Sequence, residues 1–367
     1  SGTRSTGNKN ATAVTLGSKE QGKRSSHMSG MVYIVMGGQA GSEAKGQMVA
    51  YLAQQLYQQG RLGGVVRTGG PNAGHTMTLS DGTYKMRQIP CAWHLLGVPL
   101  FIGPGSLIDP EVLSHEMKMT DINEDDWTRL KIDQSAVIIT SEDKAREVED
   151  KLKERVGSTR EGIGAARANH AMRTAKLAYP NLWCRSLIDD VALRLDQILR
   201  SGKDIIIEST QGFGLSLIHS GNYPQTTSRD ITPGQILNDA GLPTRIEHRV
   251  IAVIRTYPIR VAGNSGGFSG GEISWEQLDE QSNGYIKPEY TTVTKLQRRI
   301  GNYDSGDIKR MAMLCRPDAI CMTFLDYLNP ELAGVTDGDR MFKDRKVREF
   351  MLKVAQDSNA PVRWVCT

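Results

Sequence analysis

Short apolar runs alternate with longer helical patterns along this sequence. The first run, 32–36, ends in two glycines, and apolar side chains then recur every three or four residues from Met48 to Leu56. This spacing predicts a strand, a glycine-rich loop and a helix. Similar runs predict strands at 64–67, 100–102, 136–140, 205–208, 250–255, 319–325 and 362–365, with helices at 143–155 and 187–200. The alternation predicts an α/β fold with a mainly parallel central sheet flanked by helices.

Two loops that follow predicted strands are candidate binding segments. Residues 261–271 are rich in glycine, and residues 285–303 are polar and basic. Loops after parallel strands gather at the carboxyl edge of the sheet, where ligands bind in α/β folds. Both loops are therefore site candidates, although each pattern also suits a plain surface loop.

The composition indicates a folded chain without membrane spans. Of 367 residues, 39% are hydrophobic and 23% are charged, which is enough to bury a sizeable core. No apolar run is long enough to cross a membrane, and we expect no secretory leader. The five cysteines include no Cys-x-x-Cys pair, so we expect free thiols and a cytoplasmic protein.

The first 27 residues account for the whole net charge of +4, with five basic side chains against one acidic. This segment is rich in Ser, Thr, Gly and Asn, and it ends just before Met28. We interpret residues 1–27 as an expression tag and expect residues 28–367 to form a single domain. The rest of the chain is nearly neutral, which argues against nucleic acid as a partner.

A glycine-rich motif joins the first predicted strand to the first predicted helix: Gly37-Gly38-Gln39-Ala40-Gly41-Ser42-Glu43-Ala44-Lys45-Gly46. Glycines let the backbone approach an anion, free N–H groups at a helix start bind phosphate oxygens, and Lys45 adds positive charge. The motif lacks the Gly-Lys-Ser/Thr ending of a Walker A loop. Phosphate binding and a plain turn both stay open, and Glu43 also suits a partner of the helix dipole.

A second glycine-rich turn, 68–76, follows the strand at 64–67 and contains His75. A histidine on such a loop can act as a general acid or donate to developing charge. It can equally be an ordinary hydrogen-bonded residue. Its position on a second loop that follows a strand makes it a candidate functional residue.

Together the two motifs resemble the adenylosuccinate synthetase family. That family has Gly-Asp-Glu-Gly-Lys-Gly after its first strand and continues to Gly-His-Asn-Ala-Gly-His-Thr. Further matches to the family lie at 158–164, 208–212, 223–224, 227–228, 291–292, 298–299 and 323–326. The resemblance implies a P-loop-like α/β fold and a catalytic domain. It also implies a carbon–nitrogen ligase that joins L-aspartate to C6 of a purine nucleotide.

Ser42 stands where the family motif has aspartate. In the family that aspartate removes the N1 proton of IMP and binds magnesium, so its loss either abolishes activity or changes the substrate. A serine leaves room beside N1 and can accept a hydrogen bond from the C2 amino group of guanine. The serine is typical of the bacteriophage PurZ branch, which acts on dGMP to make a precursor of 2-aminoadenine for DNA. The resemblance therefore predicts dGMP as the nucleotide substrate.

Two other departures concern the sugar and the donor. Leu296 aligns, across an insertion, with a family arginine that contacts the ribose 2′-hydroxyl. A leucine in its place suits a deoxyribose substrate, but it also suits a change in a surface loop without functional effect. Phe324 replaces the lysine of the guanine-reading Lys-x-Asp, whereas Asp326 remains. An aromatic ring stacks on any base, so we expect ATP or dATP rather than GTP. Phe324 also suits the end of an apolar strand.

The resemblance assigns a role to each matching residue. The expected catalytic residues are Ser42, Lys45, His75 and Gln211. The expected contacts of the nucleotide substrate are Ser42, Asn72, Ala73, Thr159, Arg173, Gln211 and Thr227, with Arg173 reaching the neighbouring site of a homodimer. The expected contacts of the donor phosphates are Gly41, Glu43, Ala44, Lys45, Gly46, His75 and Thr76, and those of the donor base are Phe324 and Asp326. Aspartate is expected at Thr292, Val293 and Arg298, and Mg²⁺ at Ser42 and Gly74.

Three alternatives stay open. The first is an ordinary adenylosuccinate synthetase that acts on IMP with a relocated base. The second is a nucleotide-binding homologue without activity, although Lys45, His75 and Gln211 are all present. The third is a regulatory GTP switch, which the missing Walker loop and Phe324 disfavour. An enzyme encoded by a phage would work in the cytoplasm of its host cell.

Overall fold

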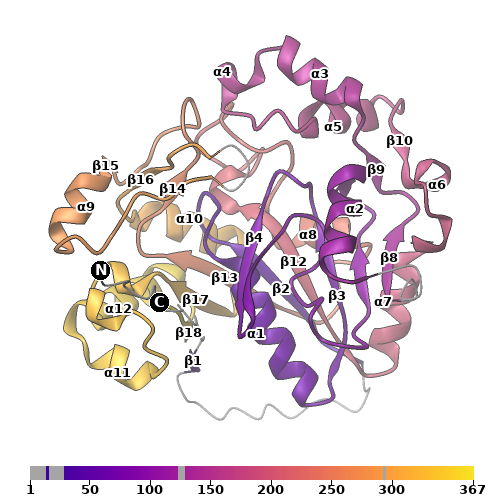
Figure 1. The fold of residues 1–367 in the computed structure, drawn as a ribbon. Helices are drawn as coiled ribbons and strands as arrows, with labels where there is room; N and C mark the ends of the chain where they lie inside the picture. The colour runs from indigo at the N-terminus through magenta and orange to yellow at the C-terminus, as the bar shows by residue number, and fades with distance from the viewer. Residues whose placement is uncertain (1–13, 16–28, 123–128, 292–294) are drawn as a thin grey trace, which may run out of the picture.

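The computed structural model describes residues 14–15, 29–122, 129–291 and 295–367. A ten-stranded sheet runs through the centre of the molecule (Figure 1). In spatial order its strands are β1 (Val14–Thr15), β18 (Val362–Val365), β17 (Ala319–Thr323), β13 (His248–Arg255), β2 (Val32–Gly37), β12 (Asp204–Gly212), β3 (Leu62–Thr68), β6 (Leu100–Ile102), β8 (Leu130–Asp133) and β11 (Ile188–Asp189). All neighbouring strands are parallel except β1 and β18. The predicted mainly parallel sheet is confirmed.

Helices cover both faces of this sheet. One face carries α1 (Lys45–Gln58) and α2 (Pro110–Met119). The other carries α7 (Val191–Arg200), α8 (Pro233–Ala240), α10 (Ser305–Cys315), α11 (Gly338–Lys343) and α12 (Arg345–Ser358). Successive residues of a strand alternate between the two cores: Val35 and Val253 belong to one, Ile34 and Ile254 to the other. Because both faces are buried, the central strands are apolar along most of their length.

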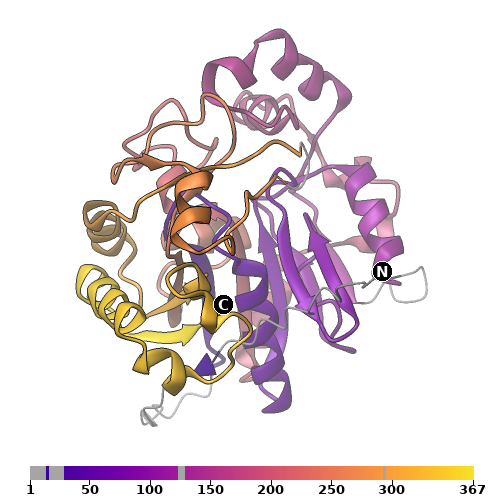
Figure 2. The ribbon, with the colours of Figure 1, turned by 60° about the vertical axis from the view of Figure 1, so that its left-hand side comes forward.

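Three smaller sheets and the remaining helices complete the fold. The sheets comprise β7 (Leu107–Ile108), β9 (Val137–Ile138) and β10 (Lys176–Leu177); β14 (Ile259–Arg260), β15 (Glu272–Ile273) and β16 (Arg299–Gly301); and the hairpin of β4 (His75–Leu79) and β5 (Gly82–Met86). The helices are α3 (Ser141–Glu149), α4 (Leu152–Val156), α5 (Ile163–Ala171), α6 (Ala178–Asn181) and α9 (Trp275–Gln281). In both views the orange segment that carries β14, β15 and β16 lies between the yellow C-terminal helices and the magenta helices α3, α4 and α5 (Figure 1, Figure 2).

Several predicted boundaries differ in the structure. The strand predicted at 136–140 forms β9, which belongs to a small sheet rather than to the central one. The strand predicted at 319–325 ends just before Phe324, whose backbone φ of 60° starts a 3₁₀ turn. The helix predicted at 143–155 is interrupted at Lys151, where a φ of 50° separates α3 from α4. The helix predicted at 187–200 begins only at Val191, since Ile188–Asp189 form strand β11. Strand β8, like β11, was not predicted because its apolar run is very short.

The ends of the chain and the cysteines bear on three other expectations. Of the predicted tag 1–27, only Val14–Thr15 is described, and it forms the antiparallel edge strand β1. No helix in the described part of the chain combines the length and apolar character needed to cross a bilayer. The five cysteines are free, and all except Cys184 are buried, as expected for thiols of the core.

Candidate active site

A cavity of about 490 Å³ opens where the central parallel strands end. Its wall takes residues from the segments that follow β2, β3, β12, β13 and β17. The two loops at 261–271 and 285–303 also contribute to it. Among the predicted site residues, the wall includes Gly41, Ser42, Ala44, Lys45, Asn72, Ala73, Gly74, His75, Thr76, Thr159, Gln211, Arg298 and Phe324. The fold thus brings together side chains that are far apart in the sequence.

Other predicted residues lie elsewhere: Glu43, Gly46, Arg173, Thr227 and Asp326 do not line the cavity. Arg173 is exposed, whereas Thr227 lies behind the wall and donates its N–H to the carbonyl of Leu215. Asp326 is buried and accepts a hydrogen bond from the hydroxyl of Tyr285 at 2.6 Å, and its contact with a donor base stays a prediction. Thr292 and Val293 lie outside the described residues.

The carboxylate of Glu43 holds the first glycine-rich loop in shape through hydrogen bonds with its backbone. Its fully buried carboxylate accepts hydrogen bonds from the N–H groups of Gln39, at 3.1 Å, and Gly41, at 2.8 Å. The same carboxylate binds Lys45 Nζ at 2.7 Å. Helix α1 begins after Ala44 without a side-chain cap, which leaves its first N–H groups for a ligand. The carboxylate of Glu43 is thus committed to the loop, and the contact expected between donor phosphates and the backbone N–H groups at 41–46 stays a prediction.

Gly46 brings α1 close to β4. An added Cβ would lie 2.8 Å from the Thr76 carbonyl oxygen and 2.9 Å from His75 Cβ. No other residue fits this contact without a shift of the backbone. Lys45, one residue earlier on α1, therefore shares the cavity wall with His75 on β4.

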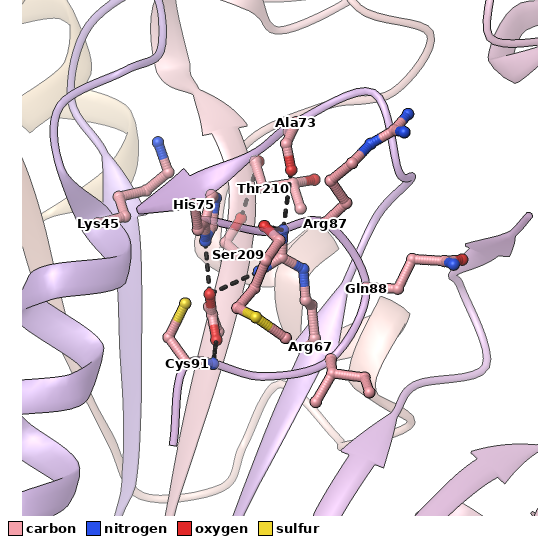
Figure 3. Close-up of polar contacts among 12 residues, drawn as sticks. Lys45, Arg67, Ala73, His75, Arg87, Gln88, Cys91, Ser209 and Thr210 are labelled. Carbon is pink, nitrogen blue, oxygen red and sulfur yellow. Dashed lines mark hydrogen bonds and ion pairs between the residues drawn. The ribbon is translucent and has the colours of Figure 1, made fainter. Parts of the chain in front are cut away.

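A buried carboxylate, Glu208 on β12, joins three residues that Figure 3 labels: Arg67, His75 and Cys91. Its Oε1 accepts hydrogen bonds from Arg67 Nη1 at 2.6 Å and His75 Nδ1 at 2.5 Å, and its Oε2 accepts from Cys91 N at 2.7 Å. Burial alone would raise the pKa of Glu208, but the charge of Arg67 and the hydrogen bond from His75 outweigh it and lower the pKa. Glu208 is therefore ionised throughout the physiological range.

His75 is held as a neutral imidazole. Burial, followed by the nearby charge of Arg67, lowers the pKa of His75 from 6.5 to about 3. Its Nδ1–H donates to Glu208, so Nε2 carries the lone pair. Nε2 is buried and has no hydrogen-bond partner among the described residues. His75 can therefore accept at Nε2, and it becomes a donor there only when an anion favours its protonation.

The same cluster does not suit a metal ion, although ligand atoms of His75, Cys91 and Glu208 lie within 4.8 Å of one another. The guanidinium of Arg67 already occupies Glu208 at 2.6 Å and would repel a cation. Burial also raises the pKa of the Cys91 thiol well above its ordinary value, which disfavours the thiolate that binds metals.

Three polar residues of the wall have left-handed backbones. Ser42 has a φ of 58°, Arg160 a φ of 60° and Gln211 a φ of 69°, conformations that residues other than glycine adopt at a cost. Ser42 is exposed in the cavity wall, and its hydroxyl has no partner among the described residues. Its carbonyl accepts a hydrogen bond from Arg255 Nη1 at 3.2 Å. The loop is thus fixed in a strained shape that presents Ser42 to a ligand.

Phe324 lines the cavity wall and packs against Arg255. The guanidinium of Arg255 lies 4.0 Å from the centroid of the Phe324 ring, and the ring of Tyr327 meets Phe324 edge-on. Leu296 also lines the cavity and is 39% exposed, which makes it available to a ligand.

Comparison with known proteins agrees with this geometry. The profile of the adenylosuccinate synthetase family matches residues 34–180 and 178–333. The chain is 35% identical to the adenylosuccinate synthetase of Pyrococcus horikoshii over 338 residues, which cover 91% of this chain and 95% of that protein. The chain belongs to the adenylosuccinate synthetase family. It is thus a synthetase-like carbon–nitrogen ligase that joins aspartate.

Two solved structures extend the comparison. The cyanophage S-2L succinoaminodeoxyadenylate synthetase (PurZ), solved with dGMP and with dATP as energy donor, superposes with a TM-score of 0.74 at 27% identity and covers 92% of both chains. The fully ligated adenylosuccinate synthetase of Plasmodium falciparum superposes with a TM-score of 0.77 at 20% identity, over 92% of this chain and all of that one. The similarity to the Plasmodium falciparum enzyme supports the fold alone.

Three charged residues of this site had no predicted role. Arg67, Glu208 and Arg255 each directly follow the apolar part of a central strand. A charged side chain in that position is at the carboxyl edge of a parallel sheet, where it either meets a partner or faces a ligand. This pattern was available in the sequence and would have marked all three.

Proposed function

We propose that this chain joins L-aspartate to C6 of dGMP with hydrolysis of a nucleoside triphosphate, forming N6-succino-2-amino-2′-deoxyadenylate, a precursor of 2-aminoadenine for DNA. One observation carries the proposal: Ser42, where the family motif has aspartate, is an exposed residue of the cavity wall. A serine hydroxyl accepts a hydrogen bond from the guanine C2 amino group, which IMP lacks. The dGMP and dATP bound to the cyanophage PurZ support these substrates.

The proposed reaction has two steps. The γ-phosphoryl group of the donor moves to O6 of guanine as its bond to the β-phosphate oxygen breaks, and the N1 proton of guanine passes to water or to a substrate phosphate. The amino group of aspartate then attacks C6, and inorganic phosphate leaves as the new C–N bond forms. Lys45 and the uncapped start of α1 would bind the transferring phosphoryl group. Gln211, in the same wall, would orient O6.

His75 would act as the general acid of this reaction, donating a proton from Nε2 to a bound phosphate. Its Nδ1–H is fixed on Glu208, so Nε2 is the atom left for a substrate. A phosphate beside Nε2 raises the pKa of the imidazole and makes Nε2 a donor. Glu208 then stabilises the imidazolium, because its charge lies 2.5 Å from Nδ1.

Magnesium fits this cavity as a phosphate-bound ion. The predicted ligands are neutral oxygens, the hydroxyl of Ser42 and the carbonyl of Gly74, and both residues line the cavity. The carboxylate of Glu43 is buried and bonded within the loop. Mg²⁺ commonly takes few protein ligands and binds substrate phosphates instead. When bound, it would neutralise charge on the donor phosphates.

Several contacts belong to the same proposal. Phe324 would stack on the base of ATP or dATP, in preference to GTP. The 5′-phosphate of dGMP would bind Asn72 and Thr159, with Arg173 of a second copy completing the site in a homodimer. Arg298 would bind a carboxylate of aspartate, because an arginine fork matches a carboxylate.

A second candidate function is the ordinary reaction with IMP. It is favoured by the archaeal relatives, since proteins 32–35% identical to this chain are adenylosuccinate synthetases. Like the dGMP reaction, it requires a group other than Ser42 to accept the N1 proton, and it leaves the Ser42 hydroxyl without the C2 amino group as a partner.

Phosphate release separates these functions. The enzyme is assayed with aspartate, Mg²⁺ and dATP, with dGMP, GMP and IMP in parallel. We expect release with dGMP and little with IMP, and we expect Ser42→Asp to lower turnover of dGMP about tenfold or more. Ser141→Asp, at an exposed serine outside the cavity, is the control. Release with IMP but not dGMP would refute the proposal. Binding of dGMP without release would indicate a homologue without activity.

A further inference from the structure

A bridge of one acidic and two basic residues crosses the cavity wall. Arg255 is fully buried and holds the carboxylate of Glu289 with both of its terminal nitrogens, Nη2 on Oε1 and Nη1 on Oε2, the latter at 3.3 Å. On the other side, Arg298 Nη1 donates to Glu289 Oε2 at 3.2 Å. Glu289 and Arg298 line the cavity, whereas Arg255 lies behind them.

The carboxylate of Glu289 has a complete set of donors. The hydroxyl of Tyr327 donates to Oε1 at 3.0 Å, which adds to the three bonds from the arginines. The backbone N–H of Arg298 also donates to the carbonyl of Glu289 at 2.8 Å. Burial would raise the pKa of Glu289, but Arg255 and Arg298 outweigh it and lower the pKa, so the carboxylate stays ionised.

The charges of the bridge leave one positive charge for a ligand. Two guanidinium groups face one carboxylate, and Arg255 is enclosed, so the excess charge is available on Arg298 at the cavity. Among the described residues no hydrogen bond uses Arg298 Nη2 or Nε, and a planar fork held at Nη1 has a fixed orientation. Such a group is prepared to receive one further carboxylate.

We propose that Glu289, anchored by Arg255 and Tyr327, is a positioning residue that orients Arg298 for a carboxylate of L-aspartate. This inference rests on the proposed role of Arg298. Glu289 does not touch the reacting atoms, and its effect passes through Arg298. A buried ion bridge need not stabilise the fold. Orientation of a ligand-binding arginine gives this bridge a role in binding instead.

Steady-state kinetics of Glu289→Gln, Arg298→Ala and the double variant test the proposal. Each is assayed with whichever of dGMP or IMP supports turnover, so failure of the dGMP proposal does not affect the result. Glu289→Gln keeps the volume of the side chain, and we expect it to raise KM for aspartate about tenfold, with kcat and KM for the nucleotide within about twofold. Glu280→Gln, on the exposed side of α9, is the matched control and should change nothing.

The double variant decides whether Glu289 acts through Arg298. In the Arg298→Ala background, Glu289→Gln should change KM for aspartate by less than about twofold. Equal effects in both backgrounds would overturn the inference. If Arg298→Ala leaves KM for aspartate unchanged, the aspartate site itself is wrong and the inference fails with it. If Arg298→Ala raises KM and Glu289→Gln does not, only the inference fails.

A second variant covers loss of folding, because Glu289→Gln leaves Arg255 buried without a counter-charge. Arg255→Met combined with Glu289→Gln removes that buried charge and still deprives Arg298 of its carboxylate partner. Thermal unfolding identifies a folded variant before kinetics. We expect the same rise in KM for aspartate, and a wild-type KM in this folded variant would overturn the proposal.

Discussion

Acidification should destabilise this protein through His75 before the buried carboxylate titrates. Burial and the charge of Arg67 lower the pKa of His75 from 6.5 to about 3, so the unfolded chain binds a proton that the folded protein does not. Because the folded pKa lies below the unfolded one, this contribution to stability is present above pH 6.5 and is lost as the pH falls toward 3. At about 1.36 kcal/mol per tenfold change, the loss between pH 7 and pH 5 is about 2 kcal/mol.

Glu208 acts in the same direction at lower pH. Its pKa is also lowered in the folded protein, so its contribution is present above the ordinary value of 4.5 and is lost as the pH falls below that value. Between pH 7 and pH 5 this carboxylate is ionised in both states. Glu208 therefore adds little to the change between pH 7 and pH 5, and comparison with a His75 variant isolates the contribution of His75.

Urea unfolding at pH 7 and pH 5 measures the effect. His75→Gln stays neutral and keeps an amide that can donate to Glu208. The wild type should lose about 2 kcal/mol more free energy of unfolding than His75→Gln over this interval. His115→Gln, at an exposed histidine, should behave like the wild type. An equal loss in the wild type and in His75→Gln would refute the reasoning, because His75 would then protonate freely in the folded protein.

Three further predictions concern packing, strain and reactivity. Gly46→Ala should destabilise the fold by about 1–3 kcal/mol and lower activity, because the added Cβ would lie 2.8 Å from a backbone oxygen of β4; Gly221→Ala, with no atom within 4 Å, is the control in thermal unfolding. Arg160→Gly should stabilise the chain by up to about 1 kcal/mol in the same assay, because it relieves a φ of 60°; a loss of stability would show that the Arg160 side chain outweighs the strain. In alkylation followed by mass spectrometry, the half-buried Cys184 should react before Cys91, whose pKa burial raises; the reverse order would contradict the buried thiol.

The central sheet was predictable because its strands are buried on both faces. The runs at 205–208 and 250–255 contain little but apolar residues, and this pattern marks strands without regard to their neighbours. Strand β11, with two residues, gains its position from pairing with β8, which a local pattern does not encode. Phe324 shows the same limit, since its apolar side chain suits the strand while its left-handed backbone ends it.

The candidate site was predictable where the residues lie in family motifs. Ser42, Lys45 and His75 belong to those motifs, and all three line the same cavity. Glu289 lies in the polar loop at 285–303, and nothing in its sequence neighbourhood announces a partner. Its contacts with Arg255 join segments 34 residues apart and depend on the three-dimensional path of the chain.

Two departures from the family motifs meet at one buried cation. Arg255 Nη1 binds the carbonyl of Ser42 at 3.2 Å, and the same guanidinium lies 4.0 Å from the ring centroid of Phe324. If Ser42 and Phe324 have the roles proposed above, selection of the purine substrate and of the donor base would share a single buried group. A change at Ser42 that moves its carbonyl shifts Arg255, and with it the ring on the donor side, since packed side chains transmit small displacements. Full conversion of substrate preference should thus require substitutions at both positions, because both residues contact the same guanidinium.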